Sequence, residues 1–227
     1  MKTSSTKKND TAGDEPRPSK GEASRATILL TAAKLATTKG LDGLSIGELA
    51  AEVGMSKSGL YAHFKSKEEL ELATIETAAA IFDREVLQPA AGAPAGTERL
   101  AALVEAFLAH LERKVYPGGC FFAAVASELD TRPGPARDRV AQILDKWQSL
   151  FRQCLLDAQA SGEIDPKAEI AQAVFEVQAM LLAGNFQFVM TNDPLRLTQA
   201  RKGVEHVLAR LATHPESKKK RSARGAP

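Results

Sequence analysis

Apolar residues recur every three or four positions along most of the chain, between two polar ends. This spacing places them on one face of an α-helix. Stretches rich in Gly and Pro separate the periodic segments, and no alternation typical of a β-strand extends over a useful length. The pattern predicts an all-α fold with helices over residues 24–39, 45–53, 56–64, 66 to about 87, 97–115, 120–131, 135–161, 166 to about 190, and 194–213.

Turn residues mark several of the predicted helix boundaries. Residues 89–96 contain two prolines and two glycines and predict a flexible loop, and residues 116–119 and 132–135 predict tight turns. Asp165-Pro166 and Asp193-Pro194 each place a capping side chain before a proline, which the first turn of a helix tolerates. These signals predict two short connections before the last two helices.

The chain divides into four parts by composition. Residues 1–22 and 214–227 are polar without apolar periodicity, and we predict a disordered N-terminal arm and a disordered basic tail. Between them, the predicted helices over residues 23–67 occupy a much shorter stretch of the chain than those over 68–213. We therefore expect a small helical head followed by a larger helical body.

The most specific pattern in the head lies between residues 45 and 70. Ser45, followed three residues later by a glutamate, has the spacing of a capping box that opens a short helix. Gly54 can take the positive φ that a sharp turn between helices demands. Ser56 then caps a second helix and Ser66 a third. Two short helices joined in this way form a helix-turn-helix, whose second helix enters the DNA major groove.

The same residues resemble a known family. The order Gly54-Met-Ser, then Leu60-Tyr, His63-Phe and Lys67-Glu-Glu-Leu is similar to the DNA-binding head of the TetR family of bacterial transcriptional regulators. The resemblance extends back through the preceding helix and covers residues 24–72, about a fifth of the chain. It implies a sequence-specific regulator of transcription in a bacterial cytoplasm.

Two positions depart from the family's pattern. Ala36 stands where the family commonly has an aromatic residue, which indicates altered packing in the head. Ala62 stands where a larger polar or aromatic residue is frequent, which indicates an altered DNA sequence preference.

The helix-turn-helix nominates seven side chains that contact DNA. Residues at the start of the second helix reach base edges, although Lys57 is as well suited to a phosphate. The family resemblance implies phosphate contacts for Tyr61, through its hydroxyl, and for Lys67, whose charge stands at a helix N-terminus. Each of three residues has a structural alternative. Tyr61 could be a partly buried aromatic, Ser45 only a helix cap, and Lys57 a solvated surface charge. The predicted DNA-binding residues are Ser45, Ser56, Lys57, Ser58, Tyr61, His63 and Lys67.

The resemblance also implies a pocket for a small-molecule effector in the body. Aromatic residues are spread over several of its predicted helices. A stripe of such residues is also what a solid core requires, so plain core is the alternative. The predicted ligand-binding residues are Phe107, Trp147, Phe151 and Met180.

The last two helices carry apolar stripes that could form a homodimer interface. Gly184 lies on the first of them and permits close approach of a second helix. The resemblance places dimerisation here, and the alternative is that both stripes are buried within one subunit. The stripes are Ala168, Ala171, Phe175, Gln178, Leu182, Asn185 and Val189, then Val204, Val207, Leu208 and Leu211.

The charge distribution supports a double-stranded DNA partner. The whole chain has a formal net charge of +2, but residues 1–67 carry +4, residues 68–213 carry −6 and residues 214–227 carry +4. A basic head and tail beside an acidic body would present one side of the molecule to phosphates. The N-terminus is polar, and no apolar run approaches the 18 or so residues of a membrane span, so we expect no membrane partner.

Cysteine and histidine are sparse. Cys120 and Cys154 do not indicate a disulfide framework, and the four histidines form no compact ligand cluster, so we expect no metal and no cofactor. Cys120 stands at a predicted helix start, where its thiol could be activated as a redox sensor; a buried structural cysteine is the alternative.

Three functions from different classes remain. The first is a repressor that binds a palindromic operator as a homodimer and is released by a small apolar ligand; the second is a ligand-independent architectural DNA-binding protein. The third is an enzyme on a helical scaffold. Against an enzyme, no glycine-rich phosphate loop follows a strand and no nucleophile motif occurs.

Overall fold

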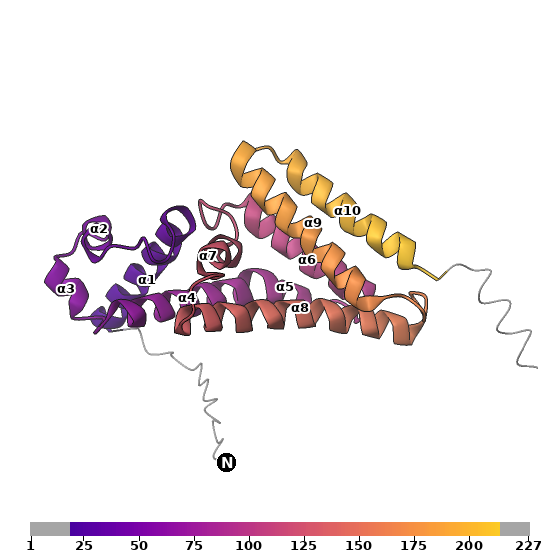
Figure 1. Cartoon of the computed structure of the whole chain (residues 1–227), viewed down its shortest axis with the longest axis horizontal. Helices are drawn as coiled ribbons and strands as arrows, with labels where there is room; N and C mark the ends of the chain where they lie inside the picture. The colour runs from indigo at the N-terminus through magenta and orange to yellow at the C-terminus, as the bar shows by residue number, and fades with distance from the viewer. Residues whose placement is uncertain (1–18, 214–227) are drawn as a thin grey trace, which may run out of the picture.

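The computed structural model describes residues 19–213, which form helices and connecting turns with one isolated β-bridge between Ile164 and Ala212. The helices α1–α3 form a head at one end, and α6–α10 form the body at the other (Figure 1). The elements are α1 (Lys20–Lys39), α2 (Ile46–Glu52), α3 (Lys57–Tyr61), α4 (Lys67–Phe82), the π-helical turn η1 (Asp83–Leu87), α5 (Gln88–Ala91), α6 (Thr97–Glu112), α7 (Phe121–Leu129), α8 (Pro135–Ser161), α9 (Ile170–Thr191) and α10 (Leu195–Leu211).

Helix α1 begins four residues earlier than the apolar pattern predicts. The Ser19 hydroxyl accepts a hydrogen bond from the Glu22 backbone N–H at 3.2 Å, and the Glu22 carboxylate accepts from the Ser19 N–H at 2.7 Å. This reciprocal capping box starts the helix among polar residues, where periodicity gives no signal. The rest of the predicted arm and the whole predicted tail lie outside the described residues.

The turn between α2 and α3 has the geometry that the sequence predicts. Gly54 has φ +68°, in the left-handed region. The Met55 N–H donates to the Ala50 carbonyl at 2.8 Å, and the Gly54 N–H donates to the Ala51 carbonyl at 3.2 Å. This pair of bonds is the Schellman motif, which satisfies the last carbonyls of α2 and directs the chain into α3.

The segment predicted as one helix over residues 66–87 is interrupted by a π-helical turn. The Gln88 backbone N–H donates to the Asp83 carbonyl, five residues back, rather than four. Pro89 follows directly and has no N–H to donate to the carbonyl four residues before it. A wider turn at this point keeps α4, η1 and α5 as one bent rod that leads from the head into the body (Figure 1).

The body is a layered bundle of helices. The long helix α8 runs beside α4, and α9 and α10 pack against each other on the opposite side of α6 (Figure 1). Helix α7 packs against both α1 and α8, so it joins the head to the body. Because α4 contacts α1 as well as α8, head and body share one continuous apolar core.

Several predicted boundaries differ from the structure, among them the start of α9 and the end of α6. Helix α9 begins at Ile170 rather than at residue 166, because the Asp165 carboxylate accepts a hydrogen bond from the Lys167 N–H at 2.8 Å and holds a turn. Helix α6 ends at Glu112 rather than 115, and Lys114 takes a left-handed φ of +50°.

Helix α9 is long and apolar enough to cross a membrane by length and composition alone, with a mean hydropathy of 1.3 over 18 residues. The expectation that no apolar run approaches that length is therefore wrong. A core helix passes the same test, and α9 buries one side against the body through residues that include Val174, Val177, Leu181 and Phe188.

Candidate DNA-binding and effector sites

Helix α3 presents polar side chains on the surface of the head. Leu60 and Phe64 are fully buried and hold this segment against α1 and α2. Lys57 and Ser58 are exposed at the start of α3, and Tyr61 at its end is 57% exposed. The alternative of a partly buried Tyr61 is therefore wrong, and its hydroxyl is free to reach a ligand outside the protein.

The hydroxyl oxygens of the predicted cap serines accept hydrogen bonds from backbone N–H groups of the helices that they cap. The Ser45 oxygen accepts from the Glu48 N–H at 3.0 Å, and the Ser56 oxygen accepts from the Gly59 N–H at 3.0 Å. Ser58 lies 3.0 Å from Ser56, oxygen to oxygen. A hydroxyl that accepts at a cap still has its own hydrogen to donate, so the exposed Ser45 can cap α2 and bind a phosphate together.

Lys57 lies across the first turn of α2. A methyl group at Gly47 would stand 2.9 Å from the lysine Cε and 3.2 Å from Nζ. Glycine at this position therefore lets the lysine cross to the neighbouring helix and puts its ammonium beside the turn that Ser45 caps. His63 is half-buried beyond the end of α3, with its ring centroid 6.4 Å from that of Phe64.

Lys67 is engaged in an ion pair within the head. Its Nζ donates to the Asp42 carboxylate at 2.5 Å and to the Asp42 carbonyl at 2.6 Å. The hydrogen bond from Lys67 lowers the pKa of Asp42, and the reciprocal bond raises the pKa of Lys67. A phosphate contact by Lys67 would have to compete with Asp42, which sequence reasoning did not identify as its partner.

Asp42 also connects the head to the body. Its second carboxylate oxygen accepts from Arg132 at 2.7 Å, just after α7. The Glu128 carboxylate, in α7, accepts from the backbone N–H groups of Leu41 and Asp42 at 2.7 and 2.8 Å. Gly40 has φ +82° and carries no side chain that would collide with Glu128. These bonds fix the loop before α2 to the body.

A second junction joins α1 to α9 through a glycine turn. The Gly118 N–H donates to the Thr37 hydroxyl at 3.1 Å, and a methyl group at Gly118 would stand 1.9 Å from the Thr37 carbonyl oxygen. On the other side of the turn, the Cys120 N–H donates to the buried Asn185 amide oxygen at 2.8 Å. The turn is thus held between the head and α9 and has no room for a side chain at Gly118.

Three of the four predicted ligand-binding residues come together in an aromatic cluster. The Trp147 ring centroid lies 4.3 Å from that of Phe151 and 6.1 Å from that of Phe107. Phe82, the last residue of α4, lies 5.1 Å from Trp147. Met180, on α9, does not share these contacts, and its sulfur packs over Gly203 of α10. The structure therefore places Met180 apart from the other three predicted residues.

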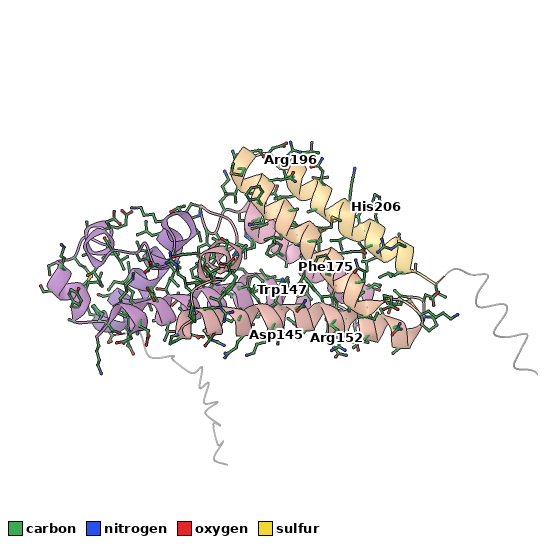
Figure 2. All side chains as sticks on the ribbon, viewed as in Figure 1. Asp145, Trp147, Arg152, Phe175, Arg196 and His206 are labelled. Carbon is green, nitrogen blue, oxygen red and sulfur yellow. The ribbon has the colours of Figure 1, made fainter. Side chains whose placement is uncertain are left out.

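The aromatic cluster is packed rather than hollow. Phe151 is fully buried and Phe107 nearly so, and Trp147 on α8 is half-buried on the side opposite Asp145 and Arg152 (Figure 2). Two hollows of about 380 and 340 Å³ lie elsewhere, one between α6 and α10 and one between the head and the loop after α7. None of the four predicted residues lines either of them.

Two polar side chains missed by the sequence analysis lie beside this cluster. His110 and Tyr116 are 1% and 3% exposed, and neither the His110 Nδ1 nor the Tyr116 hydroxyl has a hydrogen-bond partner. Burial lowers the pKa of His110 to about 4 and raises the pKa of Tyr116. The sequence places His110 in a predicted helix and Tyr116 in a predicted turn, and it gives no indication that both side chains are buried without partners.

The two cysteines are buried thiols. Cys120 stands at the N-cap of α7, yet burial raises its pKa, and burial raises the pKa of Cys154 as well. Both thiols are therefore protonated at neutral pH, which favours the structural alternative for Cys120 over an activated sensor. Within the described residues, no group of three or more His, Cys, Asp or Glu side chains could hold a metal ion.

The two stripes predicted for the dimer have different fates. In α10, Val204, Val207 and Leu211 are buried within the subunit, so this stripe follows the alternative. Gly184 in α9 also serves the interior, because a methyl group there would stand 2.6 Å from the Ala200 Cβ of α10. The opposite side of α9 is an exposed apolar face, shown by Phe175 in Figure 2 and made of Phe175, Leu182, Phe186, Val189 and Met190.

Comparison with known proteins places both parts of the chain. Residues 28–74 match the sequence model described as bacterial regulatory proteins, tetR family. Residues 96–204 match the model described as tetracyclin repressor-like, C-terminal domain. A search of curated proteins gives no match. The two matched segments cover the helix-turn-helix and most of the body, and both describe transcriptional regulators rather than enzymes.

Solved structures share the arrangement. A TetR transcriptional regulator from Chloroflexus aurantiacus is 27% identical with a TM-score of 0.76, over 84% of this chain and 94% of its own. A TetR-family regulator from Cytophaga hutchinsonii is 17% identical with a TM-score of 0.75, over 88% of this chain and all of its own. AibR, solved with isovaleryl coenzyme A and operator DNA, is 23% identical with a TM-score of 0.65, over 83% of this chain and 98% of its own. With both segments matched and the fold shared along the chain, this protein belongs to the TetR family of DNA-binding transcriptional regulators.

Proposed function

We propose that this protein is a cytoplasmic repressor that binds a palindromic operator as a homodimer and is released by a small apolar effector. The observation that carries the proposal is the exposed polar surface of α3, which ends in Tyr61 and is held rigidly by buried anchors. The second helix of a helix-turn-helix lies in the major groove of DNA and places its exposed side chains against the base edges.

The contacts with DNA divide between phosphates and bases. Tyr61, with its hydroxyl in solvent, and the Ser45 hydroxyl at the α2 N-terminus suit phosphate oxygens. Ser58, at the exposed start of α3, suits a base edge. Lys57 serves either role, and its position across Gly47 favours a phosphate next to α2. The remaining candidates, Ser56, His63 and Lys67, complete the same surface.

The homodimer forms through the exposed face of α9 in this proposal. Phe175 and Phe186 are each 64% exposed and Met190 is 70% exposed, on a helix whose other side is core. An uninterrupted apolar face of this kind is stabilised by burial against a second copy, and a two-fold axis brings each face onto itself. The two heads would then read two half-sites of an inverted repeat.

The effector binds in the body, beside the cluster formed by Phe107, Trp147 and Phe151. AibR, which shares this fold, was solved in complex with isovaleryl coenzyme A and operator DNA, which supports a protein that takes both a small molecule and DNA. An effector that prefers the conformation in which the two heads are wrongly spaced for the operator lowers the affinity for DNA. DNA lowers the affinity for the effector by the same factor.

A selection of genomic fragments bound by the purified protein, followed by footprinting, tests this function. We expect protection of an inverted repeat whose half-sites are separated by about one helical turn, 34–36 Å, or a multiple of it. Uniform binding to unrelated fragments at physiological salt would overturn it and favour the architectural alternative.

A further inference from the structure

We propose that His110 and Tyr116 form the polar end of the effector site, and that this site takes an uncharged aromatic ligand with one carbonyl or hydroxyl group. The proposal rests on the effector-released function above and names the chemistry of the effector. It assigns to these two residues the selection of ligands by their polar group, while the surrounding rings bind the apolar part.

The first observation is that two neighbouring buried side chains each carry a polar atom without a hydrogen-bond partner. His110 is in α6 and Tyr116 is in the turn that follows it, and their ring centroids are 5.8 Å apart. The His110 Nδ1 and the Tyr116 hydroxyl have no hydrogen bond. Such groups are rare in folded proteins because each has lost its bonds to water without replacement. Two of them at one place indicate a site that a ligand completes.

The second observation is that this polar pair is enclosed by aromatic rings. Phe82 lies 6.2 Å from His110, and Phe121 lies 6.0 Å from Tyr116, centroid to centroid. Phe82 also contacts Trp147 and Phe107, so the pair and the predicted effector residues border one continuous cluster. A ligand that hydrogen-bonds at one end and is flat and apolar at the other matches these surroundings.

The chemistry of the pair excludes charged ligands. Burial keeps the imidazole neutral and the phenol protonated at pH 7, as the lowered pKa of His110 and the raised pKa of Tyr116 indicate. The phenol can donate to a carbonyl oxygen or a hydroxyl, and one nitrogen of a neutral imidazole accepts while the other donates. The charges of Arg113 and Arg84 reach the pair, but both guanidinium groups are paired with the Glu85 carboxylate. A carboxylate ligand would therefore leave water with no free cation to neutralise it.

The position of Phe82 connects the site to the head. Phe82 is the last residue of α4, and the π-helical turn η1 begins directly after it. The Phe82 ring lies against both His110 and Phe122, so a ligand that inserts between His110 and the cluster displaces this ring. The displacement acts on α4, whose first residue, Lys67, is bonded to the head at Asp42. Single π-helical turns within a helix occur frequently at functional sites.

Binding of four probes with the same ring tests the proposal. The probes are naphthalene, 2-naphthol, 2-acetylnaphthalene and 2-naphthoate, measured by titration calorimetry against the full-length protein. We expect 2-naphthol and 2-acetylnaphthalene to bind at least tenfold more tightly than naphthalene or 2-naphthoate. In Tyr116→Phe and His110→Phe the preference should fall to twofold or less, with naphthalene affinity unchanged.

Tyr61→Phe is the matched control, because Tyr61 is the only other tyrosine in the chain and lies on the head surface. It should keep the full preference among the probes. Equal affinities for all four probes, no binding at millimolar concentration, or a preference that persists in both body variants would overturn the proposal. A bound water that bonds both side chains in a crystal structure of the free protein would do so as well.

Operator release separates this proposal from the function on which it rests. Probes that bind with the expected preference but leave operator affinity unchanged refute effector release and keep the site. Conversely, an effector that releases the operator equally from wild type and Tyr116→Phe keeps the function and refutes the site.

Discussion

Tyr116→Phe should stabilise the free protein, although it removes a polar group from the interior. The Tyr116 hydroxyl is buried without a hydrogen-bond partner in a residue that is 3% exposed. In the unfolded chain the same hydroxyl is hydrogen-bonded to water, so folding costs its desolvation with no compensating bond. Phenylalanine keeps the ring and its contacts with Phe121 and His110 and removes that cost.

The size of the effect follows from the cost of an unsatisfied polar group. Leaving one buried costs about 1–3 kcal/mol, and loss of the oxygen's own packing reduces the gain. We expect the free energy of unfolding to increase by about 1–2 kcal/mol. For a chain of this length, 1 kcal/mol corresponds to about 2–4 °C in Tm, so Tm should rise by about 2–8 °C.

Thermal and urea unfolding at pH 7 and fixed protein concentration measure this change, since the Tm of an oligomer depends on concentration. Tyr61→Phe removes the same group from a residue that is 57% exposed and should change stability by less than about 0.5 kcal/mol. A decrease of 1 kcal/mol or more in Tyr116→Phe would refute the reasoning, because it would mean that the hydroxyl is bonded in solution.

Three further predictions follow from the same geometry. The free energy of unfolding should fall by up to about 3 kcal/mol between pH 6.5 and 4, because His110 takes up a proton in the unfolded chain while burial holds its folded pKa near 4. In urea titrations, His110→Phe should lose this part of the pH dependence, and an unchanged profile would contradict the prediction. Tyr61→Phe and Lys67→Ala should weaken binding to all DNA sequences, and Lys67→Ala should reduce the salt slope by about one; wild-type affinity across a salt series would show the contacts to be wrong. Phe186→Glu should convert the dimer to a folded monomer in analytical ultracentrifugation, with Lys202→Glu on exposed α10 as the control; a persistent dimer would place the interface elsewhere.

The head could be predicted from the sequence because its determinants are local. Ser45, Ser56 and Ser66 each bond a backbone N–H three residues away, and Gly54 needs only its own freedom of φ. Interactions over three or four residues are recorded directly in the order of residue types. For the same reason, the exposure of Tyr61 agrees with its place between the buried anchors Leu60 and Phe64.

Periodicity could identify buried faces in the body but not what covers them. The apolar stripe of α10 could belong to a dimer or to the subunit interior, and only packing against α9 decides for the interior. Likewise, Met180 has the residue type of a pocket wall, yet its place on α9 turns it toward Gly203 of α10. Helical periodicity shows which side of a helix is buried, but it contains no information on which helix covers that side.

The contacts between head and body, and the unbonded pair His110 and Tyr116, could be found only in the tertiary structure. Their members are far apart in the chain or follow no sequence pattern. Asp42 meets Lys67 at 25 residues' separation and Arg132 at 90, and nothing in the order of residues indicates that these three charges pair with one another. His110 and Tyr116 are close in sequence, but whether a buried polar atom has a partner depends on every element packed around it. The sequence by itself determined the helices, the caps and the DNA-binding turn, since these depend on short-range bonds and periodicity. The tertiary structure alone decided which charges pair, which stripe stays exposed and which polar groups are left unbonded, since these depend on distances between segments that the chain order does not specify.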